Sequence, residues 1–346
     1  MTTLRELLNV DYPVIQAPMA GVQDSALTIA VSKAGGLGSL PCGMLTGEKI
    51  LEEVASIRAA TDRTFNLNFF CHIKPPEDPG KEAAWRQRLQ PYYEELGLEL
   101  NKDDGGASRR PFDEQTAELV AELKPAVVSF HFGLPAPDLL AYIKSNGVKV
   151  LASATTLAEA LWLEQRGADA IIAQGLEAGG HRGHFLSDDL GLQLGTFALL
   201  PQITSKVKLP VIAAGGIASA EGVKAAIQLG AVAAQVGTAY LLCTEAKTSA
   251  IHRDALQSEQ ASHTEITNVF SGRPARGIVN RLMRDQGAIS SSVPDFPNAA
   301  AALAPLRSEA EKLGKADFSP LWAGQNTMGC KEISAGKMTL KLASVQ

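Results

Sequence analysis

The sequence predicts a closed (β/α)8 barrel, the TIM-barrel fold, followed by a smaller, mostly helical C-terminal lobe. Three observations predict this α/β fold class. Short, continuous apolar runs recur through the first 245 residues, as in parallel strands that are buried on both faces. Segments with helical spacing separate these runs, because parallel strands need a crossover connection. Eight strand-helix units fit within about 245 residues, whereas an open doubly wound sheet usually stops sooner.

The expected barrel strands are the eight apolar runs 14-VIQAPM, 37-LGSLPCG, 65-FNLNFF, 126-AVVSFHF, 149-KVLASA, 170-AIIAQG, 210-PVIAAGG and 233-AAQVGTAYL. Leu and Ile recur at three- and four-residue steps between them, which predicts helices within residues 46–61, 136–147, 155–167 and 219–230. A dinucleotide-binding sheet is the alternative, but it lacks its fingerprint. No GxGxxG follows the first strand, where the chain instead has APMAGVQDS.

Two segments interrupt the repeat. Residues 75 to about 112 form a polar excursion with one helical portion around Trp85 to Leu96, and we expect it to cap the barrel mouth or to extend a helix. The repeat ends near residue 245, and a glycine-arginine loop, 271-SGRPARG, follows. The predicted domains are therefore a barrel of residues 1–245 with its insertion, and a helical lobe of residues 246–346 over the barrel mouth.

Composition and charge exclude several classes of partner. The net charge is −5 and the lysines and arginines are scattered, so no basic face for nucleic acid is indicated. No run approaches ~18 apolar residues, and Arg5 and Glu6 interrupt any signal-peptide pattern, so we expect a cytoplasmic protein without a membrane partner. A homodimer is left open. Neither a disulfide framework nor a metal site is indicated, because no CxxC pair occurs among the cysteines, Cys42, Cys71, Cys243 and Cys330, and we expect buried free thiols.

The residues that finish the strands carry the expected chemistry, because active sites of such barrels lie at the carboxyl ends of the strands. These ends offer mainly amides, hydroxyls and one histidine: Asn66, Asn68, Ser129, His131, Ser153, Gln174 and Gln235. Paired carboxylates are absent from them, which disfavours glycosidases. No strand ends in the lysine or glutamate that we would expect of an aldolase or isomerase.

Glycine-rich turns follow the last two strands, as 213-AAGGIAS and 235-QVGTA. Such turns let backbone N–H groups approach an anion, at the usual phosphate-binding position of this fold. The simpler alternative is that Gly215 and Gly216 only make a tight turn. A bound phosphate could belong to a sugar phosphate or to FMN. The amides of Asn68 and Gln174 suit the edge of a uracil-like ring, which favours FMN over a sugar-phosphate binding or isomerase barrel.

Six motifs resemble those of the nitronate monooxygenases, formerly called 2-nitropropane dioxygenases. They are QAPMAG (16–21), AGGLG (34–38), NLNFF (66–70), AQGLEAGGHRG (173–183), PVIAAGGIAS (210–219) and QVGTAYL (235–241). SFHFGLP (129–135) and LWAGQ (321–325) are similar to the nitronate-oxidising branch. The GGH loop also occurs in flavin enoyl-ACP reductases and quinone reductases, so that loop alone does not separate the three.

The resemblance implies a metal-free enzyme that uses FMN to oxidise alkyl nitronates such as propionate 3-nitronate. Molecular oxygen is the co-substrate, and the products are a carbonyl compound and nitrite. The residues that the resemblance assigns to FMN are Met19, Asn68, Gln174, Gly179, Gly216, Gln235, Gly237 and Thr238. The alternative is an NAD(P)H-dependent flavin reductase that acts on a quinone or an enoyl thioester.

Two histidines are the expected catalytic residues. His181 follows Gly179 and Gly180, which would let the backbone pass close to a flavin and hold the imidazole over its face. Its ring could orient a nitronate anion or accept a proton from a neutral nitroalkane. His131, at the end of the fourth strand, is expected to point into the same mouth. The alternative is that either imidazole is tied to neighbouring backbone and is only structural, whereas His184, His252 and His263 are expected to lie at the surface.

One stretch departs from the family pattern. Nitronate monooxygenases often place tyrosines and a lysine of the C-terminal lobe at the substrate mouth, whereas 293-VPDFPNAAAALAPLRSE has alanines and no tyrosine. Compensation by another residue or a different substrate preference would explain the difference. Candidates to compensate are Tyr92, Tyr93 and Tyr240, and charged candidates, for which a solvated surface position is favoured, are Arg273, Arg276 and Lys337.

Overall fold

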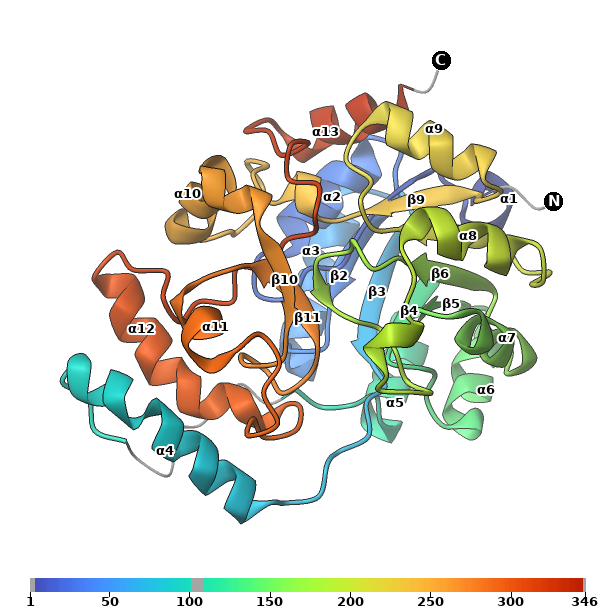
Figure 1. Cartoon of the computed structure of the whole chain (residues 1–346). Helices are drawn as coiled ribbons and strands as arrows, with labels where there is room; N and C mark the ends of the chain where they lie inside the picture. The colour runs from blue at the N-terminus through green and yellow to red at the C-terminus, as the bar shows by residue number, and fades with distance from the viewer. Residues whose placement is uncertain (1–3, 101–108, 345–346) are drawn as a thin grey trace.

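The predicted barrel is present in the computed structural model, which describes residues 4–100 and 109–344 (Figure 1). Its eight parallel strands pair in the order β1-β9-β8-β6-β5-β4-β3-β2. A bridge between Ile15 and Leu37 joins the first and last strands of this order, with a 2.9 Å bond from Gln16 N to Leu37 O, so the sheet is closed. The strands are β1 Val14–Gln16, β2 Gly38–Pro41, β3 Phe65–Phe70, β4 Val127–His131, β5 Lys149–Ala154, β6 Ala170–Gln174, β8 Val211–Ala214 and β9 Ala233–Val236.

Helices form the outer ring, and the expected helical segments are confirmed. Several begin at a side chain that accepts a hydrogen bond from an N–H of the first turn, as Thr46, Thr156 and Ser219 do. The helices that follow the strands are α2 Ser25–Lys33, α3 Gly47–Ala60, α5 Glu114–Leu123, α6 Pro137–Ser145, α7 Leu157–Gln165, α8 Thr196–Thr204 and α9 Ala220–Gln228. The last helix, α13 (Ala335–Ala343), packs against α2 and α9, so it takes the eighth position of the ring (Figure 1).

Alternate residues of the strands fill the barrel interior. Ile15, Leu37, Val127 and Ile212 belong to one buried cluster together with Leu8 from the end of α1 (Leu4–Leu8). Their strand neighbours instead pack outward against the helices, as the two-residue period of a strand requires. The interior is therefore packed with side chains, and polar residues remain for the rim at the carboxyl ends.

The lobe contains the expected helices and also a small sheet that the sequence did not predict. Strands β10 (Thr264–Thr267) and β11 (Ala275–Ile278) pair with β7 (Gly180–His181) in an antiparallel sheet of order β10-β11-β7. The loop after β6 therefore leaves the barrel and joins the lobe. The remaining lobe elements are α10 Ala250–Gln257, α11 Arg281–Gln286, α12 Ala304–Lys312 and the 3-10 turns η3 Glu259–Ser262 and η4 Asn298–Leu303.

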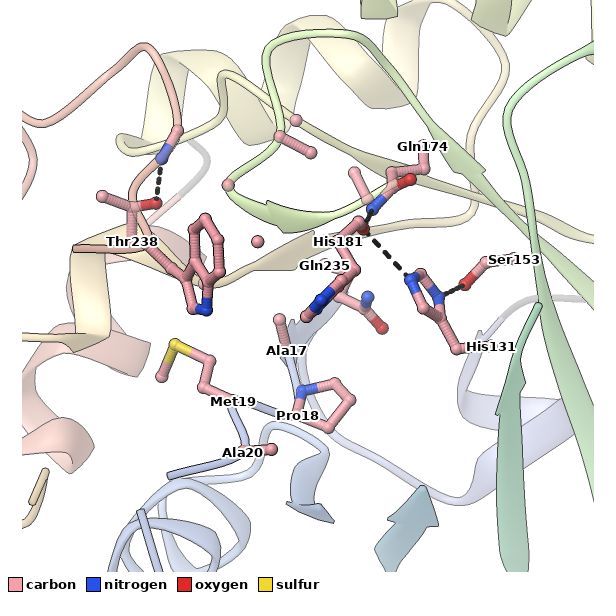
Figure 2. A pocket seen from close by; sticks show the side chains of 18 of the residues that line it. Ala17, Pro18, Met19, Ala20, His131, Ser153, Gln174, His181, Gln235 and Thr238 are labelled. Carbon is pink, nitrogen blue, oxygen red and sulfur yellow. Dashed lines mark hydrogen bonds between the residues drawn. The ribbon is translucent and has the colours of Figure 1, made fainter. Parts of the chain in front are cut away.

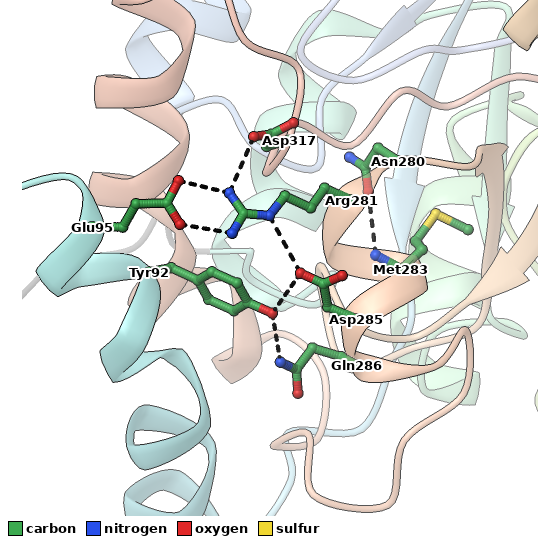
Figure 3. A network of polar contacts seen from close by, with 8 residues as sticks. All are labelled: Tyr92, Glu95, Asn280, Arg281, Met283, Asp285, Gln286 and Asp317. Carbon is green, nitrogen blue, oxygen red and sulfur yellow. Dashed lines mark hydrogen bonds and ion pairs between the residues drawn. The ribbon is translucent and has the colours of Figure 1, made fainter.

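The excursion after β3 contains the predicted helix, α4 (Pro79–Glu95), which lies along the outer side of the lobe (Figure 1). Trp85, Leu89 and Tyr93 are buried in one cluster with lobe residues. Arg281 of α11 forms a two-point ion pair with Glu95, with N···O distances of 2.8 and 2.7 Å (Figure 3). Residues 101–108 of the excursion lie outside the described residues. Among those described, no helix is both long enough and apolar enough to cross a bilayer.

Candidate active site

A pocket opens at the carboxyl ends of the barrel strands, where the lobe faces the rim (Figure 2). All ten residues that the sequence singled out line it: Met19, Asn68, His131, Gln174, Gly179, His181, Gly216, Gln235, Gly237 and Thr238. The lobe adds His252, Trp322 and Gly324 to the lining, and the end of the excursion adds Arg109. Residues at or just after the ends of six strands, β1, β3, β4, β6, β8 and β9, therefore converge with the lobe on one space.

The two glycine turns lie side by side because β8 and β9 are neighbours in the sheet. Gly215 and Gly216 have φ angles of +116° and +72°, which glycine adopts most readily. A Cβ atom on Gly215 would lie 2.9 Å from the hydroxyl of Thr196, so close packing also requires glycine there. The lobe covers the turns, since Asn326 Nδ2 donates to Gly216 O over 2.9 Å. The turns can present main-chain groups to an anion without a side chain between them.

Glu177 is the carboxylate of this part of the pocket, and its charge is already engaged. It accepts hydrogen bonds from the N–H and the hydroxyl of Thr196, at distances of 2.8 to 2.9 Å, where α8 begins. A carboxylate at a helix N-terminus is stabilised by the helix dipole. Glu177 therefore fixes the loop after β6 against α8.

Gly179 allows this loop to cross the lobe. A Cβ atom there would lie 2.5 Å from Gly324 N and 2.6 Å from the carbonyl carbon of Ala323. No real side chain tolerates such distances, so the backbones of the loop and of the LWAGQ segment can meet only at glycine. The missing side chain faces the lobe backbone.

The amides of the rim differ in how they are paired. Gln174 binds the GGH loop with both ends of its amide: Nε2 donates to His181 O over 3.0 Å, and Oε1 accepts from Gly183 N over 2.8 Å. Asn68 Nδ2 donates to the carbonyl and hydroxyl of Ser129. By contrast, Oε1 of Gln235 is buried and has no hydrogen-bond partner among the described residues. An unpaired buried acceptor costs about 1–3 kcal/mol, so a ligand N–H is expected opposite Gln235.

His131 uses both ring nitrogens within the protein (Figure 2). Nε2 lies 3.1 Å from His181 O, and Nδ1 lies 3.0 Å from the hydroxyl of Ser153. A carbonyl can only accept, so Nε2 carries the proton and Nδ1 accepts from Ser153. Burial lowers the pKa of His131 to about 3, so the ring is neutral. Together with Gln174, His131 holds the carbonyl of His181.

His181 is fixed from the lobe side. Its Nε2 lies 2.9 Å from the hydroxyl of Ser271, and its ring packs against Phe296 and Trp322, with centroids 5.3 and 5.5 Å away. This side-chain hydrogen bond to a described residue is at Nε2, which leaves Nδ1 as the nitrogen available to a ligand in the pocket. Burial, with a contribution from the charge of Arg109, holds the pKa of His181 well below its usual value. A neutral imidazole therefore faces the pocket.

Several expectations about surface residues are wrong, because tertiary packing buries them. His184 and His252 are 1% and 4% exposed, and His252 lines the pocket. Arg276 is also buried, and it donates from Nε to Leu176 O over 3.0 Å. His263 is exposed, as expected.

The tyrosines that could have compensated at the substrate mouth do not line the pocket. Tyr92 and Tyr93 pack between α4 and the lobe, and Tyr240 is buried 2.9 Å from the hydroxyl of Thr339. Sequence reasoning missed Arg109 as a lining residue. The sequence holds no signal for it, because it follows a polar stretch without periodicity.

Comparisons with known proteins agree over nearly the whole chain. A family model described as "Nitronate monooxygenase" matches residues 1–344. The nitronate monooxygenase of Pseudomonas aeruginosa is 41% identical over 334 residues, covering 96% of this chain and 95% of that protein. The nitronate monooxygenase of Paraburkholderia phytofirmans is 42% identical over 342 residues, covering 98% and 93%.

Two solved structures are similar over the same extent. A nitroalkane oxidase from Streptomyces ansochromogenes has 37% identity and a TM-score of 0.88, covering 99% of this chain and 96% of that chain. FabK from Thermotoga maritima has 26% identity and a TM-score of 0.73, with coverage of 99% and 95%.

Proposed function

The chain belongs to the nitronate monooxygenase family, a family of flavin-dependent oxidoreductases, and from this premise we propose that it uses FMN to oxidise alkyl nitronates such as propionate 3-nitronate. Molecular oxygen is the proposed co-substrate, and the proposed products are a carbonyl compound and nitrite. The observation that carries the FMN proposal is the unpaired, buried Oε1 of Gln235 in the pocket. Cytoplasmic residence and a homodimer stay predictions of the sequence.

The residues present fit FMN. The turns at Gly215–Gly216 and Gly237–Thr238 offer main-chain groups to its phosphate, at the usual position for this fold. Gln235 Oε1 can accept from the N–H of the isoalloxazine ring, and Met19 lines the same pocket beside Gly237. When bound, FMN supplies the acceptor for the electrons of the nitronate. The protein supplies placement and electrostatic field.

The orientation of the Ser271 hydroxyl sets whether Nδ1 of His181 donates a hydrogen bond to the substrate or accepts a proton from it. The hydroxyl of Ser271 can donate to His181 Nε2, and Nδ1 then carries a proton that can be donated to a nitronate oxygen. It can instead donate to Arg273 O, 3.2 Å away, and accept from Nε2–H. Nδ1 then has a free lone pair that can accept a proton from a neutral nitroalkane. Rotation of one hydroxyl therefore selects between binding an anion and removing a proton.

We propose that His131 acts through His181 instead of contacting the substrate, because both of its ring nitrogens are used. Nε2 of His131 and Nε2 of Gln174 donate to the same carbonyl, that of His181. Antiparallel pairing of β7 with β11, with His181 opposite Ala275, holds the loop from the other side. The imidazole of His181 is thus held between barrel and lobe, which reduces the cost of ordering it when substrate binds.

Absorbance and oxygen consumption test the proposed function. We expect the purified protein to have flavin absorption bands and to consume oxygen on addition of propionate 3-nitronate, with release of nitrite. A second candidate is an NAD(P)H-dependent flavin reductase, favoured by the similarity to FabK of Thermotoga maritima. Rapid anaerobic bleaching of the flavin by NADH, with none by the nitronate, would establish that candidate instead. A colourless protein that does not take up FMN would overturn both.

A further inference from the structure

Arg109 is a cation in the pocket, and no ion pair joins it to a carboxylate of the described residues. It lines the same pocket as His181, and its Nη1 is buried with no hydrogen-bond partner among the described residues. Its guanidinium lies over the ring of Phe296, with Cζ 5.5 Å from the centroid. The pKa of Arg109 is lowered by burial first and by the charge of Arg307 next, and no carboxylate among the described residues opposes these effects. Within the described part of the chain, the buried guanidinium therefore has no compensating negative charge.

The position of Arg109 relates it to the reacting end of the pocket. The ring of Phe296 contacts both residues: the guanidinium of Arg109 lies over it, and the ring centroid of His181 is 5.3 Å from its centroid. The charge of Arg109 also lowers the pKa of His181, next in importance to burial. Arg109 and His181 are therefore close neighbours across one aromatic ring, within reach of the two ends of a short ligand.

No other described residue neutralises this end of the pocket. The carboxylate that lines the pocket, Glu177, is bonded to Thr196 beside the glycine turns. Arg273 stacks on Phe132 with its Cζ 4.2 Å from the centroid, but it does not line the pocket, and the carboxylates of Asp188 and Glu159 act on its charge. The positive charge at this end of the pocket is therefore that of Arg109, which favours a ligand with a negative charge besides that of the nitronate.

We propose that Arg109 is the specificity-determining residue that binds a carboxylate at the end of the substrate remote from the nitronate carbon. A guanidinium presents its N–H donors in a planar fork that matches a carboxylate in two-point geometry. Burying a cation without a partner is unfavourable, so a bound carboxylate would supply the counter-charge that the described residues do not give Arg109. Ala299 and Ala302 of η4 do not take this role, because they pack in the cluster with α4 and do not line the pocket. The proposal rests on the proposed nitronate oxidation for the identity of the other end.

Two substrates that differ at the remote end test this role. We expect Arg109→Gln to lower kcat/KM for propionate 3-nitronate about 10- to 100-fold, the loss expected for a charge-assisted hydrogen bond. The loss should be in KM, because the contact is remote from the reacting carbon and is the same in ground and transition states. For propyl-1-nitronate, which lacks the carboxylate, we expect a change of less than about twofold. For propionate 3-nitronate, the kcat/KM of Arg109→Lys should lie between that of the unsubstituted protein and that of Arg109→Gln.

Arg110→Gln is the matched control, because Arg110 is the exposed neighbour and does not line the pocket. It should leave both substrates unaffected. The proposal is overturned when Arg109→Gln retains full kcat/KM for propionate 3-nitronate, or when both substrates lose the same factor.

A binding measurement separates failure of this proposal from failure of the proposed function. Calorimetric titration of the purified protein with butyrate and with butyramide needs no turnover. We expect butyrate to bind about 10-fold more tightly, and Arg109→Gln to abolish the difference. Equal binding of the two by the unsubstituted protein refutes the carboxylate site. When neither nitronate is oxidised but butyrate is preferred, the proposed reaction fails and the role of Arg109 in binding carboxylates stands.

Discussion

Acid should destabilise this protein in a pH range where most carboxylates remain ionised. Five of its six histidines are buried or face the pocket, and burial is the main cause of the lowered pKa of each. The pKa of His72, His184 and His252 is lowered from 6.5 to about 4. The unfolded chain therefore binds more protons than the folded chain below pH 6.5, and stability is lost as the pH falls from 6.5 toward 4.

The size of this loss in the free energy of unfolding follows from the folded and unfolded pKa values of the histidines. Between pH 7.5 and 5.5, a histidine that is neutral when folded and titrates at 6.5 when unfolded removes about 1.4 kcal/mol from the free energy of unfolding. Three such residues remove about 4 kcal/mol, a large part of the 5–15 kcal/mol that is typical of a folded protein. His131 and His181, whose pKa values are also lowered, add to this loss.

Denaturant unfolding at pH 7.5 and 5.5, followed by tryptophan fluorescence, measures the effect. His184→Asn should reduce the difference between the two pH values by about 1.4 kcal/mol, because one proton-binding group is removed from the unfolded chain. His263→Asn is the control, because His263 is exposed and its substitution should leave the difference unchanged. Equal stability at the two pH values, or equal effects of the two substitutions, would refute the reasoning.

Three further predictions concern the pocket. Gln235→Leu should weaken FMN binding about 10-fold, because it removes the acceptor for the ring N–H, and flavin fluorescence in a titration measures this. Ser153→Ala should lower kcat/KM with FMN still bound, since His131 loses the donor that fixes its tautomer, and should cost about 1–3 kcal/mol in denaturant unfolding. Gly179→Ala should lower the melting temperature strongly and reduce nitronate turnover, because its Cβ would clash with Gly324.

Gly180→Ala is the matched comparison for Gly179→Ala. Gly180→Ala adds a Cβ that meets no atom within 4 Å, and its cost is about 1–2 kcal/mol of backbone strain at φ +70°. A milder effect of Gly179→Ala than of Gly180→Ala would contradict the packing argument. Undiminished FMN affinity in Gln235→Leu would remove the main support for FMN in this orientation. Unchanged kcat/KM in Ser153→Ala would mean that the tautomer of His131 does not matter to His181.

The barrel could be predicted from the sequence because its cause is local and repeated. Each strand is a short apolar run, and several connecting segments show helical periodicity, so the alternation as far as β9 is visible without tertiary information. The helix in the eighth position, α13, follows only after the lobe, so the sequence assigned it to the lobe. The convergence of the site residues was predictable for the same reason. Strand ends that are far apart in sequence, such as Asn68 and Gln235, must share a rim once the barrel closes.

The rest depended on packing between segments that are distant in sequence. Strand β7 has only two residues and exists through its pairing with β11, so no local pattern marks it. His252 was expected at the surface because a helix of mixed composition does not reveal which neighbour covers it. Arg109 has no periodic context at all, and its position in the pocket, with its guanidinium over Phe296 of the lobe, exists only in the folded chain. The hydrogen bonds of Gln174 and His131 to the carbonyl of His181 are likewise properties of the assembled rim.

The return of α13 to the outer ring has a consequence for dissecting the chain. Because this helix covers Val14, Leu27 and Val236, everything between β9 and α13 is an insertion anchored at both ends. A chain that ends near residue 245 would lack α13, so apolar side chains of the barrel that this helix covers would be exposed to solvent. To obtain the barrel alone, the lobe between η2 (Thr238–Tyr240) and α13 should be deleted and the two elements joined by a short linker. These two elements already contact each other in the full chain. A tag added after residue 346 would follow α13, a helix of the outer ring, and so need not disturb the pocket at the carboxyl ends of the strands.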